Sequence, residues 1–190
     1  MRSEQEFLVD VLQRLNQAGI EYMLTGSMAS NFWGTPRTTH DLDFVVLLKP
    51  DQVDRFTEAF EDGLFIQRES VRGAFQPPYQ FNVLDEKSAL KADFWLLRQS
   101  EFEREMFRRR LSLELFGVQA WVATAEDVLL HKLYWNLLTP SERQLLDAAG
   151  VFAVQADDLD MDYLKLWAAK LGVSAELGDL ISGKLRPKNT

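Results

Sequence analysis

The chain has 190 residues, which is enough to bury a sizeable core in one domain or in a core with a helical appendage. It contains no cysteine, so disulfides and thiolate metal sites are excluded, and a metal ion would have to be held by carboxylates or by His40 and His131. The formal net charge of -8 disfavours tight nonspecific binding to nucleic acids or anionic membranes. The polar N-terminal residues and the absence of a long apolar run predict a cytoplasmic protein without a membrane span.

Up to residue 123 the hydrophobic pattern switches between helical and strand periods. Apolar residues recurring every three or four positions predict helices, and short apolar or β-branched runs predict strands. The polar turn at 85–87 and Gly117 predict two hairpins, the first with Asp93 in its second strand. In chain order we expect a helix at 4–18, a strand at 20–24, a helix at 28–33, a buried strand at 39–48, a helix from 50 to 60, strands at 64–68, 79–84 and 90–97, a helix at 102–110, and strands at 111–116 and 118–122.

From residue 124 onward only helical patterns occur. Thr124 is typical of a helix N-cap, and in Thr139-Pro140-Ser141-Glu142 the threonine is expected to cap a helix whose first residue is the proline. The expected fold is therefore α+β: a mixed β-sheet core flanked by helices over residues 1–123, with a C-terminal helical subdomain over 124–190 packed on it. The predicted helices of this subdomain are at 125–138, 140–153, 160–171 and 174–182.

Three aspartates lie within predicted strands. Asp41 and Asp43 are two residues apart, so both project from one side of their strand, while Leu42 projects from the other. Neighbouring carboxylates repel each other unless a cation neutralises them, which favours a divalent metal with oxygen ligands. Asp93 would add a third carboxylate if its strand lies beside theirs. Three carboxylates can hold two Mg²⁺ or Mn²⁺ ions, which can clamp the phosphates of a nucleotide.

A glycine turn precedes these aspartates. Gly26 removes a side chain where the backbone must approach a phosphate, and Ser27 with the following helix start offers hydroxyl and amide donors to an anion. A Gly-Ser pair or an Asp-x-Asp pair alone is common. The combination of both with a third strand-borne aspartate is seldom assembled by chance.

This combination of Gly26-Ser27, Asp41-Leu42-Asp43 and Asp93 resembles the DNA polymerase β-like nucleotidyltransferase superfamily. The run from Arg37 through Thr39 to Asp43 is similar to its small bacterial branch, which includes the AbiEii-type toxins of toxin-antitoxin systems. Later motifs of that branch are similar to the segments at 126–135 and 141–147. The resemblance covers about residues 20–150, and the chain departs from it at Gln144, where the toxin branch often has lysine, and beyond residue 155.

The resemblance implies a two-metal nucleotidyltransferase, which moves a nucleoside monophosphate from a nucleoside triphosphate to an acceptor. It implies that Asp41 and Asp43 bind Mg²⁺ or Mn²⁺ and that Asp93 completes the triad, either as a third metal ligand or as the general base. Lys132 is implied to be a further catalytic residue. The implied nucleotide-binding residues are Gly26, Ser27, Arg37, Thr39, Lys132 and Asp147.

The acceptor stays open among a tRNA, a protein hydroxyl and a small molecule such as an antibiotic. Two alternative functions also stay open: a toxin that pairs with an antitoxin protein, and a silent nucleotide-binding module of the same fold.

Helical spacing gives Lys132 an inward position. On a helix that begins near Thr124, Lys132 shares a face with the apolar Val128 and Trp135. An inward lysine needs an anion, which a triphosphate would supply, and Asp147 on the next helix is expected to hold the ammonium when no nucleotide is bound.

The sequence leaves open the roles of His40 and of the basic cluster in the segment 104–110. His40 is either a metal ligand or nucleotide contact, or a residue with a structural or solvent-facing role. The cluster either contacts the phosphates of an acceptor or forms a solvated face among glutamates. Its members are Arg104, Arg108, Arg109 and Arg110.

Overall fold

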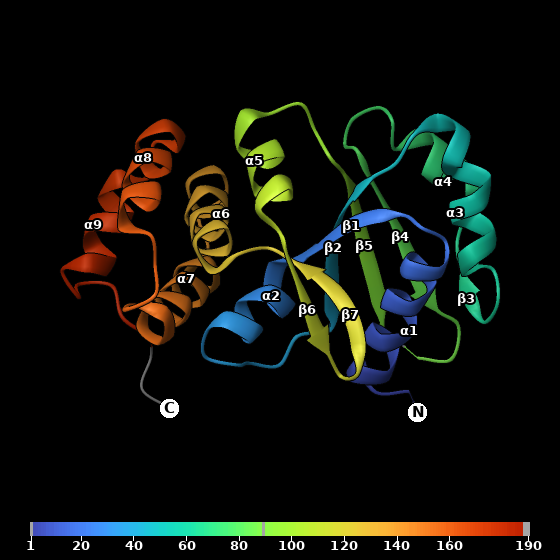
Figure 1. Cartoon of the computed structure of the whole chain (residues 1–190), viewed down its shortest axis with the longest axis horizontal. Helices are drawn as coiled ribbons and strands as arrows, with labels where there is room; N and C mark the ends of the chain where they lie inside the picture. The colour runs from blue at the N-terminus through green and yellow to red at the C-terminus, as the bar shows by residue number, and fades with distance from the viewer. Residues whose placement is uncertain (1, 89, 188–190) are drawn as a thin grey trace. The chain divides into compact units, whose positions relative to one another are not determined.

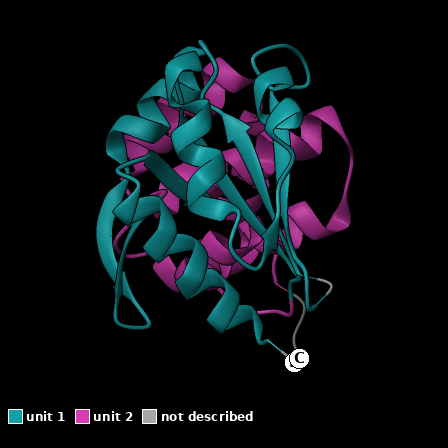
Figure 2. Cartoon of the chain, turned by 90° about the vertical axis from the view of Figure 1, so that its right-hand side faces the viewer, with its two compact units in different colours: residues 1–25, 39–122 teal, residues 26–38, 123–190 magenta. Residues whose placement is uncertain are grey.

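The computed structural model describes residues 2–88 and 90–187, which divide into two compact units (Figure 2). The first unit contains the residues up to Thr25 together with Thr39–Val122. The second contains Gly26–Thr38 and the residues from Ala123 onward. The expected division at residue 123 therefore differs from this one in the segment 26–38, which belongs with the C-terminal helices.

The first unit is built on a seven-stranded mixed sheet with the strand order β3-β4-β5-β2-β1-β7-β6 (Figure 1). The pairs β2–β5 and β1–β7 are parallel, and the other neighbouring pairs are antiparallel. Both predicted hairpins, β4–β5 and β6–β7, are present. The strands are β1 (Glu21–Thr25), β2 (Asp41–Leu47), β3 (Leu64–Phe65), β4 (Gln80–Asp85), β5 (Lys91–Leu96), β6 (Leu111–Leu115) and β7 (Val118–Val122).

Aromatic side chains join the helix α3 to one face of the sheet. Phe56 of α3 lies 5.1 Å from Phe81 and 5.2 Å from Phe94, measured between ring centroids. Phe94 in turn stacks on Phe44 of β2 at 5.3 Å. Because side chains alternate along a strand, the neighbours of Phe44 and Phe94 point to the opposite face. The helical segments are α1 (Glu4–Gln17), the 3₁₀ turn η1 (Pro50–Gln52), α3 (Val53–Phe60), α4 (Arg68–Gly73) and α5 (Glu101–Arg109).

Two expected elements differ from the structure. The strand expected at 64–68 is only two residues long, and the helix α4 follows it. Only Val71 of α4 is buried, so this helix has no apolar periodicity that a sequence pattern could reveal. The helix expected at 140–153 begins at Glu142 instead, with Ser141 as its N-cap, because Thr139 is already the C-cap of the preceding helix.

The second unit is helical, and the segment 26–38 is held in it by close backbone contacts. The Trp33 indole N–H donates a hydrogen bond to the Ala123 carbonyl at 2.7 Å. A Cβ atom on Gly34 would lie 2.6 Å from the Val151 backbone nitrogen and 2.8 Å from the Gly150 carbonyl carbon, so the backbones meet where no side chain fits. The helices are α2 (Gly26–Trp33), α6 (Ala125–Leu138), α7 (Glu142–Gln155), α8 (Met161–Leu171) and α9 (Ser174–Ile181).

Across residues 2–88 and 90–187, we find no helix with the length and hydrophobicity that crossing a membrane requires.

Candidate active site

The three aspartates lie on the two central parallel strands of the first unit. The register of β2 and β5 pairs Asp43 with Asp93 and Asp41 with Lys91. Directly paired residues of neighbouring strands point to the same face of a sheet. Asp41, Asp43, Lys91 and Asp93 therefore share the face opposite to Phe44, and we call these four residues the carboxylate cluster.

Lys91 was not predicted from the sequence, yet its ammonium lies between two of the carboxylates. Its Nζ is 2.8 Å from Asp93 Oδ2 and 3.5 Å from Asp41 Oδ1. Asn82 of β4 donates a hydrogen bond from Nδ2 to the other oxygen of Asp93, at 2.7 Å. The hydrogen bond to Asp93, together with the charges of Asp93 and Asp41, outweighs burial and raises the pKa of Lys91. The positive charge of Lys91 thus partly neutralises the cluster.

A row of polar side chains crosses the sheet through this cluster. Thr25 of β1 pairs with Asp43, Asp43 pairs with Asp93, and Asp93 pairs with Asn82. Thr25 is 3% exposed, and within the described part of the chain its Oγ1 has no hydrogen-bond partner. A buried hydroxyl without a partner is unusual in a folded protein, and here it lies directly beside Asp43 in the row.

The donor set fits a divalent metal ion by its chemistry. Carboxylate oxygens are the ligands that Mg²⁺ and Mn²⁺ prefer, and three carboxylates here share one face. Among the residues that the structure describes, no three acidic or histidine side chains are grouped so as to hold a metal as they stand. Lys91, rather than a third carboxylate, contacts both Asp41 and Asp93. A divalent ion at these two carboxylates would therefore meet the ammonium of Lys91.

A second charged group lies within the helical unit and centres on Asp147 of α7. Arg37 donates from Nε to Oδ1 at 2.7 Å and from Nη2 to Oδ2 at 2.8 Å. Lys132 of α6 donates to Oδ2 at 2.8 Å, so Asp147 holds the ammonium as expected. Arg37 Nη2 also donates to Ser27 Oγ at 2.8 Å. Four residues predicted for nucleotide binding are thus brought together, and we call them the Asp147 network.

The Asp147 network is largely buried, and its carboxylate contacts two basic side chains. The side chains of Asp147 and Lys132 are only 5% and 7% exposed, while Arg37 is 27% exposed. Burial alone would raise the pKa of Asp147, but the hydrogen bonds and charges of Arg37 and Lys132 outweigh it and lower that pKa below its ordinary value. Arg37 and Lys132 lie next to Ser27 in the first turn of α2, and guanidinium, ammonium and hydroxyl groups are of the kind that bind a phosphate.

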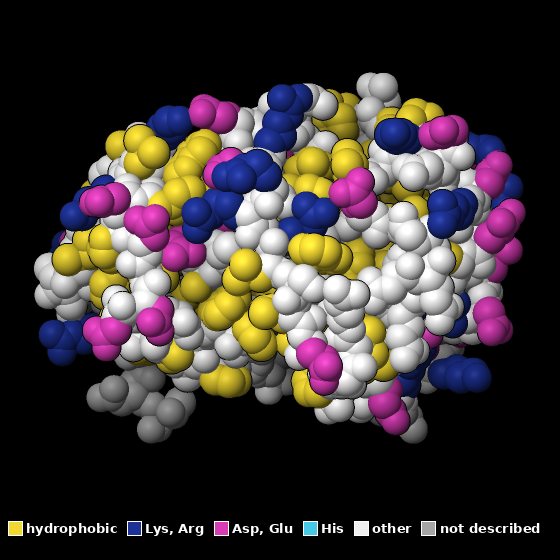
Figure 3. Space-filling model, in the orientation of Figure 1, with side chains coloured by type: hydrophobic (Ala, Val, Ile, Leu, Met, Phe, Trp, Pro, Cys, Tyr) yellow, Lys and Arg dark blue, Asp and Glu magenta, His cyan; other side chains and the backbone are white. Residues whose placement is uncertain are grey.

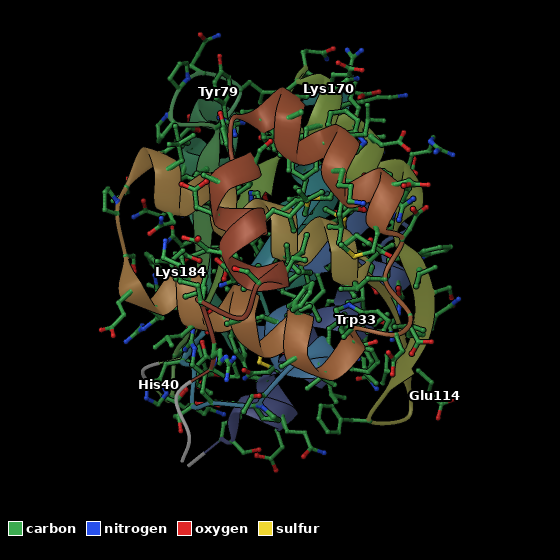
Figure 4. The ribbon with its side chains drawn as sticks, turned by 90° about the vertical axis from the view of Figure 1, so that its left-hand side faces the viewer. Trp33, His40, Tyr79, Glu114, Lys170 and Lys184 are labelled. Atoms are coloured by element: carbon green, nitrogen blue, oxygen red, sulfur yellow. The ribbon has the colours of Figure 1, made fainter. Side chains whose placement is uncertain are left out.

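Three other residues singled out from the sequence lie outside the contacts described so far. Gly26 begins α2 with φ of 61°, a left-handed conformation that favours glycine. Thr39 is buried, and its hydroxyl donates to the Asp41 carbonyl at 3.4 Å, where β2 begins. The side chain of His40 is 75% exposed and lies 2.7 Å from a carboxylate oxygen of Glu4, which places it at the surface of the first unit (Figure 4).

The basic cluster lies on and just after α5. Figure 3 shows basic side chains gathered over this helix, with acidic ones among them. Arg108 pairs with Glu105 at 2.6 Å, and Arg110 pairs with Glu21 at 3.2 Å. Much of the positive charge is therefore matched by acidic neighbours from the same unit.

The sequence contained a signal for two of the residues that sequence reasoning missed. Lys91 is two positions before Asp93 in the same predicted strand, so strand alternation already places both on one face. Thr25 directly precedes the Gly26-Ser27 turn. Asn82 carried no such signal, because its position opposite Asp93 depends on the register of the hairpin.

Comparison with known proteins gives structural but not sequence matches. No protein-family model matches the sequence, and a search of curated proteins finds no significant match. The fold matches that of an antigenic nucleotidyltransferase-like protein from Paracoccidioides brasiliensis, with a TM-score of 0.58 and 14% identity over 98% of this chain and 94% of that one. The chain has a nucleotidyltransferase-like fold.

Two structures of the antibiotic-resistance factor ANT(2'')-Ia are also similar. A crystal structure in complex with adenylyl-2''-tobramycin gives a TM-score of 0.62 and 10% identity, covering 90% of this chain and 98% of that one. A solution structure gives 0.54 and 10% identity, covering 93% and 92%. At these identities the similarity establishes the fold, and the resemblance to AbiEii-type toxins stays a prediction.

Proposed function

We propose that this chain is a nucleotidyltransferase, which moves a nucleoside monophosphate from a nucleoside triphosphate to a hydroxyl group of an acceptor. The observation that carries the proposal is the pairing of Asp43 with Asp93 on parallel strands, with Asp41 on the same face. The nucleotidyltransferase-like fold supports it.

The carboxylate cluster is assigned to metal binding. Asp41, Asp43 and Asp93 would hold Mg²⁺ or Mn²⁺, which when bound neutralise charge on the phosphates and on the leaving pyrophosphate. Asp43 lies between Thr25 and Asp93 in the row and two positions from Asp41, so it would be the central ligand of the set. Loss of the Asp43 charge should therefore weaken metal binding most directly.

The Asp147 network is assigned to the triphosphate. Arg37 and Lys132 supply positive charge, while Ser27 and the first amides of α2 supply hydrogen-bond donors. Asp147 fixes the two cations in place, so they need not be ordered when the nucleotide binds. Gly26 leaves the backbone at the start of α2 without a side chain.

In the reaction, the acceptor oxygen forms a bond to the α-phosphorus as the bond from that phosphorus to the oxygen bridging to the β-phosphate breaks. Pyrophosphate leaves with the electron pair of the broken bond. The hydroxyl proton passes to a carboxylate, for which Asp93 is the candidate base. The acceptor is to be sought among tRNA, protein hydroxyls and small molecules, including aminoglycosides, because the ANT(2'')-Ia structure contains an adenylylated aminoglycoside.

The test is transfer of label from each α-labelled nucleoside triphosphate, with Mg²⁺, to a panel of tRNA, protein extract and aminoglycosides. We expect transfer by the wild type and by Asp62→Asn, a control that removes an exposed carboxylate of the same unit. Transfer should be lost in Asp43→Asn and Asp93→Asn, with unchanged circular dichroism spectra. Transfer that survives Asp43→Asn would contradict the assignment of the carboxylates.

Two other outcomes distinguish the alternatives. Nucleotide binding without transfer to any acceptor would identify a silent nucleotide-binding module. Growth arrest on expression of the wild type, but not of Asp43→Asn, would identify a toxin and justify a search for its antitoxin.

A further inference from the structure

Lys91 has no role in the proposed reaction, although it contacts two of the three carboxylates. Its Nζ lies 2.8 Å from Asp93 and 3.5 Å from Asp41, and its side chain is 36% exposed. We propose that Lys91 is a built-in counter-ion of the carboxylate cluster, which holds Asp41 and Asp93 together in the metal-free protein and is displaced when a divalent ion binds. This inference rests on the proposed function, because it takes the cluster to be the metal site.

The need for a counter-ion follows from the sheet register. Asp43 and Asp93 are directly paired, and Asp41 lies one side-chain step along the same face. Carboxylates on one face of neighbouring strands repel one another, which destabilises the folded chain unless a positive charge lies near them. Lys91 is directly paired with Asp41 and two positions from Asp93, so the same register delivers its ammonium to both.

The contacts of Asp93 indicate that a divalent ion would displace the Lys91 ammonium rather than bind beside it. One of its oxygens accepts from Asn82 at 2.7 Å, and the other contacts Lys91 at 2.8 Å. A divalent ion bound to Asp93 would therefore meet either the amide or the ammonium, and the ammonium repels it. The long side chain of Lys91 can turn its charged end into water, whereas the short side chain of Asn82 keeps its amide near Asp93, because the register of β4 and β5 places the two residues opposite each other. Lys91 is thus the group that gives way.

Removing the charge of Lys91 should have opposite effects on the metal-bound and the metal-free protein. In Lys91→Met, a bound metal no longer competes with an ammonium a few ångströms away, so its affinity should rise on the order of tenfold. The metal-free protein should become less stable, because the carboxylates lose their counter-charge. Lys91→Gln, which keeps a hydrogen-bond donor without the charge, should show the same two changes and serves as a second variant if Lys91→Met folds poorly.

The experiment is titration of the full chain with Mn²⁺ alone, following free Mn²⁺ by electron paramagnetic resonance, together with thermal unfolding in a metal chelator. Lys87→Met is the matched control, because it removes an exposed lysine charge from the β4–β5 turn. We expect tighter binding and a lower melting temperature for Lys91→Met and Lys91→Gln, near wild-type values for Lys87→Met, and weak binding for Asp43→Asn.

The outcomes separate the two proposals. Equal or weaker Mn²⁺ affinity in both Lys91 variants, with normal binding by the wild type, overturns the counter-ion role and leaves the proposed function standing. An absence of Mn²⁺ binding in the wild type and in both Lys91 variants overturns the metal site and the counter-ion role with it. Mn²⁺ binding by the Lys91 variants but not by the wild type supports the counter-ion role, because Lys91 would then exclude the ion altogether.

Discussion

Replacing Asp147 with Asn tests whether one buried carboxylate neutralises two cations. In the folded chain Asp147 accepts two hydrogen bonds from Arg37 and one from Lys132. Asparagine keeps the size of the side chain and one acceptor oxygen but loses the charge. The Lys132 ammonium, whose side chain is 7% exposed, then remains buried without its anion.

The size of the effect follows from this burial. Removal of one partner from a buried ion pair costs about 3–5 kcal/mol, because the other charge is left uncompensated. Arg37 is 27% exposed, so water replaces part of its lost partner and Lys132 accounts for most of the cost. In a protein of this size the loss corresponds to a fall in melting temperature of roughly 6–20 °C. Lys132→Met should cost less, about 2 kcal/mol or below, because Asp147 keeps both hydrogen bonds from Arg37.

The assay is urea and thermal unfolding at pH 7 of the wild type, Asp147→Asn, Lys132→Met and the double variant. The double variant should recover part of the stability lost in Asp147→Asn, since methionine needs no anion. Inorganic tripolyphosphate should raise the melting temperature of Asp147→Asn more than that of the wild type, because it supplies the missing negative charge. A smaller loss in Asp147→Asn than in Lys132→Met would refute the reasoning.

Three further predictions concern the packing of the second unit, the polar row and acid stability. Gly34→Ala should lower the free energy of unfolding in urea by about 1–3 kcal/mol, because the added Cβ would meet the backbone of Val151. The control Gly73→Ala should not destabilise the chain, since no atom lies within 4 Å of the added Cβ. Equal effects of the two substitutions would contradict the close backbone approach at Gly34. Thr25→Val should leave stability unchanged or raise it by up to about 1 kcal/mol, because the buried hydroxyl has no partner in the described structure, and a clear loss would reveal one. The pKa of Asp147 is lowered in the folded state, so the ionised carboxylate stabilises the fold fully above the ordinary value of 3.8 and loses this effect as the pH falls through the lowered value. The difference in unfolding free energy between the wild type and Asp147→Asn, measured by urea unfolding, should therefore narrow below about pH 3.8. A difference that does not change with pH would count against a stabilising role of the ionised carboxylate.

Much of the fold was predictable because its signals are local. The alternation of Asp41, Leu42 and Asp43 fixes which side chains of β2 share a face, and the structure buries Leu42 and leaves the aspartates accessible. Thr124 accepts a hydrogen bond from the Asp127 amide, as its position before a helix predicts. The helix α4 escaped prediction because it has one buried residue and hence no periodic pattern.

The sequence by itself determined which of the predicted residues lie on one face, since strand alternation places Asp41 with Asp43 and helical spacing turns Lys132 inward. Only the tertiary structure decided which charges meet. Lys91 reaches Asp41 because β2 and β5 are parallel and in register, and Arg37 joins Asp147 across 110 positions of the chain. A periodic pattern reports the face on which a side chain lies, but pairing between distant elements depends on how the whole core packs, which no local pattern contains.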